Sequence, residues 1–216
     1  MSVGRVHTYR DRADAGRQLA AALTATRRHD VVVVGLARGG VAVAAEVADA
    51  LGAPLDAVAV RKVGHPRQPE YALGAVAPGG GVYVRDEGGL GAADLAAAVE
   101  RAATAADELD LRFHDDVRPA ADLAAKVVLL VDDGLATGAT MIAAIRWARE
   151  RGAARVIAAV PLAAAQTAAT VAREADELVC PHVRERFGSV GLWYARFDQV
   201  TDDEVIRLLD RARERL

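Results

Sequence analysis

The chain of 216 residues has a single cysteine, few aromatic residues and no long uncharged apolar run. One cysteine, Cys180, excludes an intramolecular disulfide framework and suits a reducing compartment. No stretch approaches the ~20 apolar residues of a membrane span, and the polar N-terminus lacks the apolar core of a secretory signal. The net charge of −3 gives no electrostatic case for nucleic acid or an anionic membrane. We therefore expect a cytoplasmic globular protein with neither of these partners.

Histidine and lysine are also scarce. The five histidines, at positions 7, 29, 65, 114 and 182, form no HExxH motif and no Cys/His pairing, so metal-centred hydrolysis has little support. Cys180 follows an apolar run and is expected to be packed and not nucleophilic. Only two of the 27 basic residues are lysines, Lys62 and Lys126. Because this chain otherwise uses arginine as its basic residue, a lysine at a strand end is a candidate functional residue.

The abundant features are short apolar runs that alternate with alanine-rich helical patterns. The runs predict strands at 31–35, 55–60, 82–84, 127–131, 155–160 and 178–180. The helical patterns predict helices over 11–28, 39–51, 92–113, 139–151, 163–174 and 202–215, the last with a Thr201/Glu204 capping box. Two prolines and two glycines indicate a mobile loop over 63–74. This alternation predicts a single α/β domain over 1–216, with a central, mainly parallel sheet flanked by helices.

The most informative stretch is VVLLVDDGLATGAT, residues 127–140. In parallel sheets ligands bind beyond the carboxyl ends of the strands, and here an apolar strand is followed by a loop of small residues. Such a loop before a helix exposes backbone N–H groups and the positive end of the helix dipole, which suits phosphate. Gly134 and Gly138 permit close backbone approach, and Thr137 and Thr140 add hydroxyl donors. The loop is not a Walker A motif, because no lysine follows Gly138.

Asp132 and Asp133 need a second explanation, because two carboxylates beside a phosphate site would repel the ligand. A ribose diol can donate its hydroxyls to the carboxylates, and a nearby Mg²⁺ ion would offset the charge. The stretch therefore predicts a ribose 5-phosphate site, with the acids on the sugar and residues 134–140 around its phosphate.

Residues 127–140 resemble the phosphoribosyl pyrophosphate (PRPP) signature of the type I phosphoribosyltransferases. In that family the loop after the first strand binds pyrophosphate through its backbone, often with an unusual cis peptide and a basic residue, and LARGG (36–40) is similar to it. Lys62 resembles the lysine that opens the family's flexible loop, which would make 63–74 a lid over PRPP. The resemblance implies catalytic roles for Asp132, Asp133, Lys62 and Arg38. The PRPP-binding residues that it implies are Ala37, Arg38, Gly39, Gly40, Lys62, Asp132, Asp133, Gly134, Leu135, Ala136, Thr137, Gly138, Ala139 and Thr140.

In this family a hood over the sheet selects the acceptor, and residues 181–200 are the matching segment. Aromatic residues make up 4% of the chain, yet four of them gather at 184–200. We expect Phe197 to pack in the core. The residues expected to face the acceptor are Glu70 and Tyr71 of the lid and Trp193 and Tyr194 of the hood.

The resemblance implies Mg²⁺-dependent transfer of the 5-phosphoribosyl group of PRPP to a nitrogen nucleophile, such as a nucleobase or related heterocycle. Mg²⁺ would be held mainly through PRPP, near Asp132 and Asp133, without direct protein ligands. Purine-salvage members that use hypoxanthine or guanine often carry an acid where Ala136 stands, which weakens that acceptor class. The overall resemblance is to uncharacterised, predicted phosphoribosyltransferases with the same long helix at 92–113, outside the shared fold, and an F-G-S-V-G-x-W-Y hood. The family commonly forms homodimers.

Three other classes of protein share parts of this pattern. A regulatory module that senses PRPP or a nucleotide without transfer would keep the same site, and it stays open. A phosphoacceptor receiver domain fails because no lysine follows Lys126. A nicotinamide-dependent dehydrogenase lacks both G-x-G-x-x-G and a ribose-binding acid after the second strand, where Arg61 and Lys62 stand.

Overall fold

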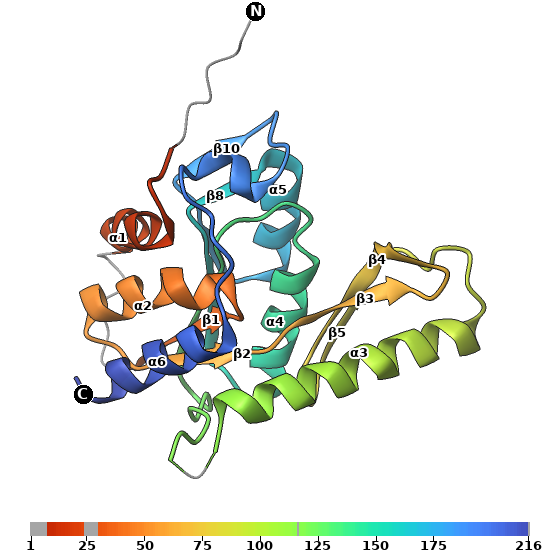
Figure 1. Cartoon of the computed structure of the whole chain (residues 1–216), viewed down its shortest axis with the longest axis horizontal. Helices are drawn as coiled ribbons and strands as arrows, with labels where there is room; N and C mark the ends of the chain where they lie inside the picture. The colour runs from red at the N-terminus through yellow and green to blue at the C-terminus, as the bar shows by residue number, and fades with distance from the viewer. Residues whose placement is uncertain (1–7, 24–29, 116, 216) are drawn as a thin grey trace, which may run out of the picture.

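A five-stranded parallel sheet forms the centre of the computed structural model, which describes residues 8–23, 30–115 and 117–215 (Figure 1). In order across the sheet, the strands are β2 (Leu55–Val58), β1 (Val31–Leu36), β6 (Val127–Val131), β7 (Arg155–Ala159) and β9 (Glu177–Val179). Every neighbouring pair is parallel. The predicted α/β class is confirmed, and the carboxyl ends of the adjacent strands β1 and β6 meet at one edge.

Helices cover both faces of this sheet (Figure 1). One side carries α1 (Arg12–Ala22), α2 (Gly39–Leu51) and α6 (Asp202–Arg213), and the other carries α4 (Ala139–Glu150) and α5 (Ala165–Glu174). Successive strand side chains point to opposite faces. Val32 and Val34 therefore join the core around α4, whereas Val31 and Val33 join the core around α2. Burial on both faces explains why these strands are continuous apolar runs.

Residues 63–74, predicted as a loop, instead form most of a β-hairpin. The strands β3 (Arg61–His65), β4 (Gln68–Ala77) and β5 (Gly80–Val84) make an antiparallel sheet in that order. The loop prediction was wrong, because the residues that suggested it have other places in the hairpin. Pro66 lies in the turn, and a Cβ on Gly74 would lie 2.0 Å from the carbonyl oxygen of Tyr83. This glycine permits close approach of two strands and does not mark a loop.

The predicted long helix is confirmed as α3 (Ala92–Phe113), and it packs along the hairpin. Its buried alanines Ala98 and Ala102 recur at helical spacing and contact Val63 and Leu73 of the hairpin. Further along the helix, Phe113 joins the core around α2. The hairpin and α3 thus form an arm that projects from one side of the central sheet (Figure 1).

Most remaining boundaries agree with prediction to within two residues, and three details differ. β2 ends at Val58, short of residue 60, and α5 begins at Ala165 because a short strand, β8 (Leu162–Ala164), precedes it. That strand pairs in parallel with β10 (His182–Arg184) inside the predicted hood, and neither strand was predicted. α1 ends at Ala22, and the rest of the predicted helix, 24–28, lies outside the described residues. The Glu204 N–H donates to Thr201 Oγ1 at 3.2 Å, as the capping box predicts.

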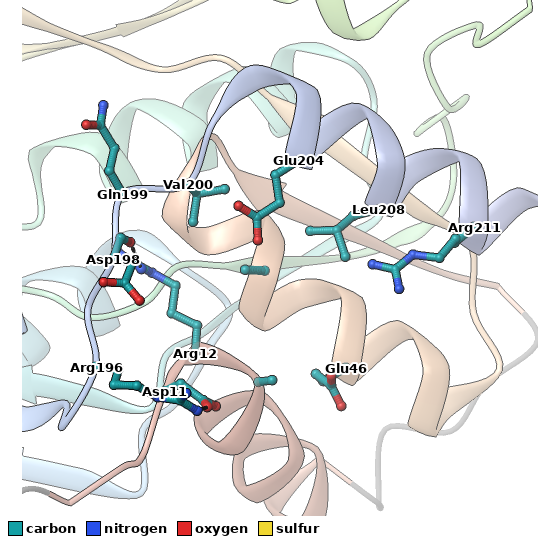
Figure 2. Close-up of a pocket in the computed structure, with 12 residues that line it drawn as sticks. Asp11, Arg12, Glu46, Arg196, Asp198, Gln199, Val200, Glu204, Leu208 and Arg211 are labelled. Carbon is teal, nitrogen blue, oxygen red and sulfur yellow. Dashed lines mark hydrogen bonds and ion pairs between the residues drawn. The ribbon is translucent and has the colours of Figure 1, made fainter.

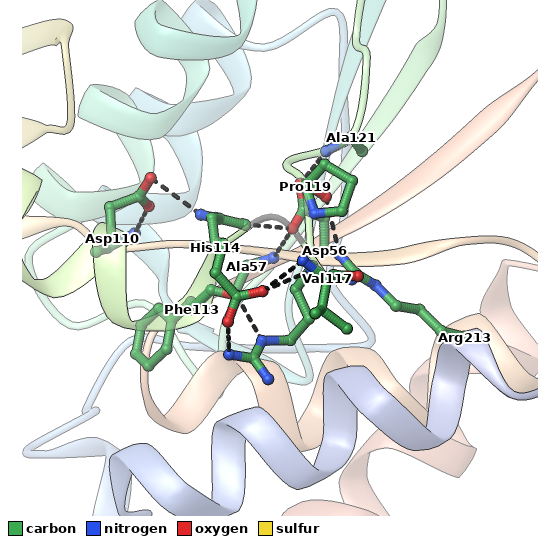
Figure 3. Close-up of polar contacts among 12 residues, drawn as sticks. Asp56, Ala57, Asp110, Phe113, His114, Val117, Pro119, Ala121 and Arg213 are labelled. Carbon is green, nitrogen blue, oxygen red and sulfur yellow. Dashed lines mark hydrogen bonds and ion pairs between the residues drawn. The ribbon is translucent and has the colours of Figure 1, made fainter.

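A buried polar cluster fastens the end of α3 to the central sheet (Figure 3). His114 lies between two carboxylates: its Nε2 is 2.8 Å from Asp56 of β2, and its Nδ1 is 3.1 Å from Asp110 of α3. The other oxygen of Asp56 accepts the N–H of Ala121 at 2.8 Å. This cluster joins a helix, a strand and a connecting segment through one imidazole ring. No helix in the described ranges has the length and apolar character to cross a membrane.

Candidate active site

A pocket of about 260 Å³ lies where the loops after β1 and β6 meet. The two strands pair in parallel with Gly35 opposite Val131, so their following loops emerge side by side. The pocket is lined by Leu36, Ala37, Arg38, Gly39, Val60, Lys62, Asp132, Asp133, Gly134, Leu135, Ala136, Thr137, Gly138, Thr140 and Val190. The structure therefore brings together all but two of the predicted PRPP-binding residues, since Gly40 and Ala139 do not line the pocket.

The loop 134–138 is held in place from outside the pocket. Leu135 is fully buried and exchanges backbone hydrogen bonds with β8, through Leu162 and Ala164, both at 3.0 Å. The hydroxyl of Thr167 on α5 donates to the Ala136 carbonyl at 2.7 Å. These contacts tie the outward side of the loop to β8 and α5, the two elements that the hood packs beside.

The loop delivers the N-terminus of α4 to the pocket. Gly138 has a φ of 77°, a conformation that glycine adopts without strain. The first intrahelical hydrogen bond runs from the Ile142 N–H to the Gly138 carbonyl at 3.0 Å. The N–H groups before it have no partner within the helix, as at the start of any α-helix. Together with the nearby hydroxyls of Thr137 and Thr140, they form a site suited to an anion.

The loop after β1 carries the expected unusual peptide: the bond between Ala37 and Arg38 is cis. Two glycines then start α2 against the acid pair. A Cβ on Gly39 would lie 2.2 Å from Asp133 Oδ2, and one on Gly40 would lie 2.5 Å from the Val131 carbonyl oxygen. Because any side chain there would collide, the paired glycines are what allows both loops to share one pocket.

Asp132 and Asp133 are held differently although they are neighbours. Asp132 Oδ1 accepts the N–H of Asp133 at 2.8 Å, and Asp133 Oδ2 accepts Arg12 Nε at 2.8 Å. Burial, and then the charge of Asp133, raise the pKa of Asp132 well above the usual carboxyl value. Burial also raises the pKa of Asp133, against the lowering effect of Arg12. The pocket therefore holds two largely buried acids beside one close cation, Arg12, which sequence reasoning missed.

The two predicted basic residues have unequal positions. Lys62 is exposed on β3 and lines the pocket, where its charge lowers the pKa of Asp132. It begins no loop, since it stands inside a strand. Arg38 also lines the pocket, but its guanidinium lies 3.2 Å from Asp202 at the start of α6, which Arg112 also contacts at 3.1 Å. Lys62 is thus the more available cation in this conformation.

The hood residues differ from their predicted places. Tyr194 is buried, and its hydroxyl donates to the backbone carbonyl of Asp133 at 2.6 Å; burial raises its pKa far above the usual tyrosine value. Trp193 donates to the Phe187 carbonyl at 3.0 Å. Neither lines the pocket: Tyr194 contacts the backbone of Asp133, whereas Trp193 packs against Phe187 within the hood. Phe197, predicted as core, is 37% exposed, and the prediction was wrong because its ring carries the Arg12 guanidinium at 3.8 Å. Val190 lines the pocket and was missed.

Glu70 and Tyr71 lie on β4, towards the free end of the arm. The Tyr71 hydroxyl donates to Asp86, and its ring meets that of His65 edge-on at 6.3 Å. Neither Glu70 nor Tyr71 is among the residues that line the pocket of the acid pair. A contact with an acceptor would require movement of the hairpin, and their roles stay predictions.

The sheet order and the acid pair before the helix are those of α/β proteins with the type I phosphoribosyltransferase fold. The chain belongs to the phosphoribosyl transferase family, because the model of the phosphoribosyl transferase domain matches residues 2–192. The resemblance carried by residues 127–140 is thereby confirmed.

Its relatives agree with this assignment. Proteins named "Putative phosphoribosyl transferase" from two strains of Mycobacterium tuberculosis are 45% identical over 206 residues, which is 94% of this chain. The match covers 46% of their length, so the chain spans about half of these relatives. The crystal structure of TT1426 from Thermus thermophilus is 41% identical with a TM-score of 0.79, over 93% of this chain and 97% of that one. AQ2163 from Aquifex aeolicus is 14% identical over 85% of each chain, with a TM-score of 0.52, a likeness of fold alone.

Proposed function

We propose that this protein binds PRPP and transfers its 5-phosphoribosyl group to a nitrogen nucleophile, with release of pyrophosphate. The observation that carries the proposal is one pocket in which paired carboxylates stand directly before an N–H-rich helix start. Carboxylates suit the hydroxyls of a sugar, and the helix start suits its phosphate. Family membership supports the class of reaction, and the acceptor is a nucleobase or related heterocycle in this proposal.

In this proposal, three parts of PRPP are bound by three different sets of pocket residues. Residues 134–140 bind the 5-phosphate through backbone N–H groups and the Thr137 and Thr140 hydroxyls. Asp132 and Asp133 accept the hydroxyls of the ribose diol. The backbone of 37–40, of which residues 37–39 line the pocket, binds the pyrophosphate group together with Lys62. Each part thus has residues of complementary charge or hydrogen-bonding type.

In the reaction the bond between C1 and the pyrophosphate oxygen breaks, and that oxygen leaves with the electron pair. The lone pair of the acceptor nitrogen forms the new bond to C1, and the nitrogen then loses its proton to solvent water. Positive charge develops near C1 during this exchange, and the buried carboxylates of Asp132 and Asp133 stabilise it electrostatically. Lys62 and the backbone of 37–40 stabilise the negative charge on the departing pyrophosphate. Positioning supplies the remaining acceleration.

The acid pair also bears on the proposed magnesium ion. Carboxylate oxygens are the hard ligands that Mg²⁺ prefers. The described residues contain no group of three or more acidic, histidine or cysteine side chains that would hold a metal alone. In this proposal the ion is held mainly by PRPP and water, beside Asp132 and Asp133. When bound, Mg²⁺ would neutralise charge on the pyrophosphate group.

The test is pyrophosphate release from PRPP with Mg²⁺ and a panel of purines, pyrimidines and simple amines. We expect release that depends on one class of acceptor, with a ribosylated product of matching mass. Reactions without acceptor control for hydrolysis of PRPP. Tight binding of PRPP with no product from any acceptor would favour a sensing role. Absence of PRPP binding would overturn the proposal.

A further inference from the structure

Arg12 is the cation closest to the acid pair, although it lies 121 positions before Asp133 in the chain. Its Nε donates to Asp133 Oδ2 at 2.8 Å, and both side chains are largely buried, at 13% and 14% exposure. The nearby Gly39 leaves room for this contact, because a Cβ there would lie 3.1 Å from Arg12 Nε. Three separate elements therefore converge to place one ion pair at the pocket.

The guanidinium of Arg12 is fixed on its other sides by the hood. Its Nη1 donates to the Asp198 carbonyl at 2.6 Å, and its Cζ stands 3.8 Å above the Phe197 ring. Figure 2 shows Arg12 reaching from α1 towards Asp198 along one side of a second cavity, of about 310 Å³, between α1, α2 and α6. Arg12 thus stands between that cavity and the acid pair, and a planar guanidinium held at two nitrogens has little freedom to rotate.

The start of α1 is itself anchored to the hood. Tyr9 and Arg10 pair with Ala195 and Arg196 through backbone hydrogen bonds of 2.8 Å. Asp11, the N-cap of α1, accepts the Asp14 N–H at 2.9 Å. Its carboxylate also accepts the Arg196 guanidinium at 2.6 Å (Figure 2). The position of Arg12 is therefore set by backbone contacts and does not depend on its pairing with Asp133.

One oxygen of each acid is committed to the protein. Asp132 Oδ1 accepts the Asp133 N–H, and Asp133 Oδ2 accepts Arg12. No side chain of the described residues donates a hydrogen bond to the remaining oxygens, Asp132 Oδ2 and Asp133 Oδ1. One open oxygen on each neighbouring carboxylate matches the two hydroxyls of a vicinal diol, with one acceptor for each donor.

We propose that Arg12 is a positioning residue for recognition of the sugar: it occupies Asp133 Oδ2 and so orients the carboxylate that accepts one ribose hydroxyl. This role rests on the proposed function of the pocket. Arg12 donates its hydrogen bonds to Asp133 and Asp198, and to no residue of the phosphate loop or the pyrophosphate loop in the contacts above. Its effect therefore falls on the diol and leaves phosphate binding in place. The expected signature is a loss of discrimination between sugars with and without the diol.

The experiment compares ribose 5-phosphate with 2-deoxyribose 5-phosphate by calorimetry without metal, for wild type, Arg12→Gln, Arg12→Lys and Arg17→Gln. Wild type is expected to prefer the ribose sugar by about tenfold, the value of one hydrogen bond. Arg12→Gln reduces that preference to less than about threefold, with little change for the deoxy sugar. Arg12→Lys retains an intermediate preference. Arg17→Gln is the matched control on the same helix, where Arg17 pairs with Glu46 at the surface, and it behaves as wild type.

Four further outcomes separate the explanations. In an Asp133→Asn background, Arg12→Gln has no additional effect on the preference if Arg12 acts through Asp133. Equal loss of affinity for both sugars, with native circular dichroism, would overturn positioning in favour of a general structural role. Wild-type preference in Arg12→Gln would overturn the role of Arg12 alone. Wild type that binds neither sugar phosphate would overturn the proposed function and this inference with it.

Discussion

The raised pKa values of Asp132 and Asp133 indicate that burying these carboxylates costs free energy, which a bound ligand can offset. Both carboxyls have a raised pKa because burial disfavours their charged forms. Asp132 lacks the direct cation that Asp133 has in Arg12. A carboxylate kept in such a place lowers the stability of the free protein near neutral pH, since its folded pKa lies above its unfolded one. Such a destabilising carboxylate is expected at a functional site, where its charge contributes to binding.

Replacing Asp132 by Asn should therefore separate binding from stability. The amide keeps the shape but loses one strong acceptor, so ribose 5-phosphate affinity should fall by about 1–3 kcal/mol. The melting temperature should stay equal or rise at pH 8, because the buried charge is gone. Calorimetry and thermal unfolding measure the two effects. Asp94→Asn, an exposed acid on α3, is the control. Unchanged affinity in Asp132→Asn would remove this acid from the diol site.

At the scale of elements, the start of α2 can pack against the acid pair because its first two residues, Gly39 and Gly40, have no side chain. Gly39→Ala would put a Cβ 2.2 Å from Asp133 Oδ2, so either the carboxylate or the helix must shift. We expect a destabilisation of about 1–3 kcal/mol and a clear loss of sugar-phosphate affinity, measured by urea unfolding and calorimetry. Gly91→Ala is the matched control, because that glycine also stands at the start of a helix, α3, and a Cβ there would meet nothing within 4 Å. Similar behaviour of the two variants would show that the contact is not required.

The His114 cluster should make the attachment of α3 depend on pH. Burial lowers the pKa of His114, but hydrogen bonds to Asp110 and Asp56, with their charges, outweigh it and raise the pKa to about 10. A folded pKa above the unfolded value near 6.5 gives stability that is complete below pH ~6.5 and lost as pH rises towards 10. Wild type should exceed His114→Gln by about 2 kcal/mol at pH 6, and the difference should shrink at pH 9. Urea unfolding at both pH values measures it; a constant difference would contradict a charged imidazole.

At the scale of the whole molecule, the parts that the sequence could predict are those with local causes. The central strands are apolar on both faces, and the motif 127–140 contains its own strand, acids and helix start. The hairpin was missed because proline and glycine mark turns and close strand contacts as well as loops. The contacts of Arg12 and Tyr194 with Asp133 could not be predicted, since they span 121 and 61 positions and arise only when α1 and the hood pack together.

The arm is anchored at one end, which predicts a gradient of stability along it. Ala75 and Ala77 of β4 join the core around α4, and a Cβ on Gly81 would lie 2.5 Å from the Ala143 carbonyl oxygen. In the part of the chain that the structure describes, the free end has no matching contact with the central core. Tyr71 there is 37% exposed and packs against His65 within the arm. Protected amides at 64–72 should therefore exchange about tenfold faster than those at 74–77, a difference of ~1.4 kcal/mol in opening.

Hydrogen exchange read by mass spectrometry tests this gradient, with two leucine variants as a matched pair. Leu73→Ala removes a fully buried side chain of the arm, and it should speed exchange in β3 to β5 while β1 and β6 keep their protection. Leu129→Ala empties a site in the central core and should speed exchange in both regions. Since Lys62 stands on β3 at the pocket, slower exchange at 64–72 on addition of ribose 5-phosphate or PRPP is the result expected of a closing lid. Uniform protection along β4, unchanged by ligand, would show instead that the hairpin is a rigid wall.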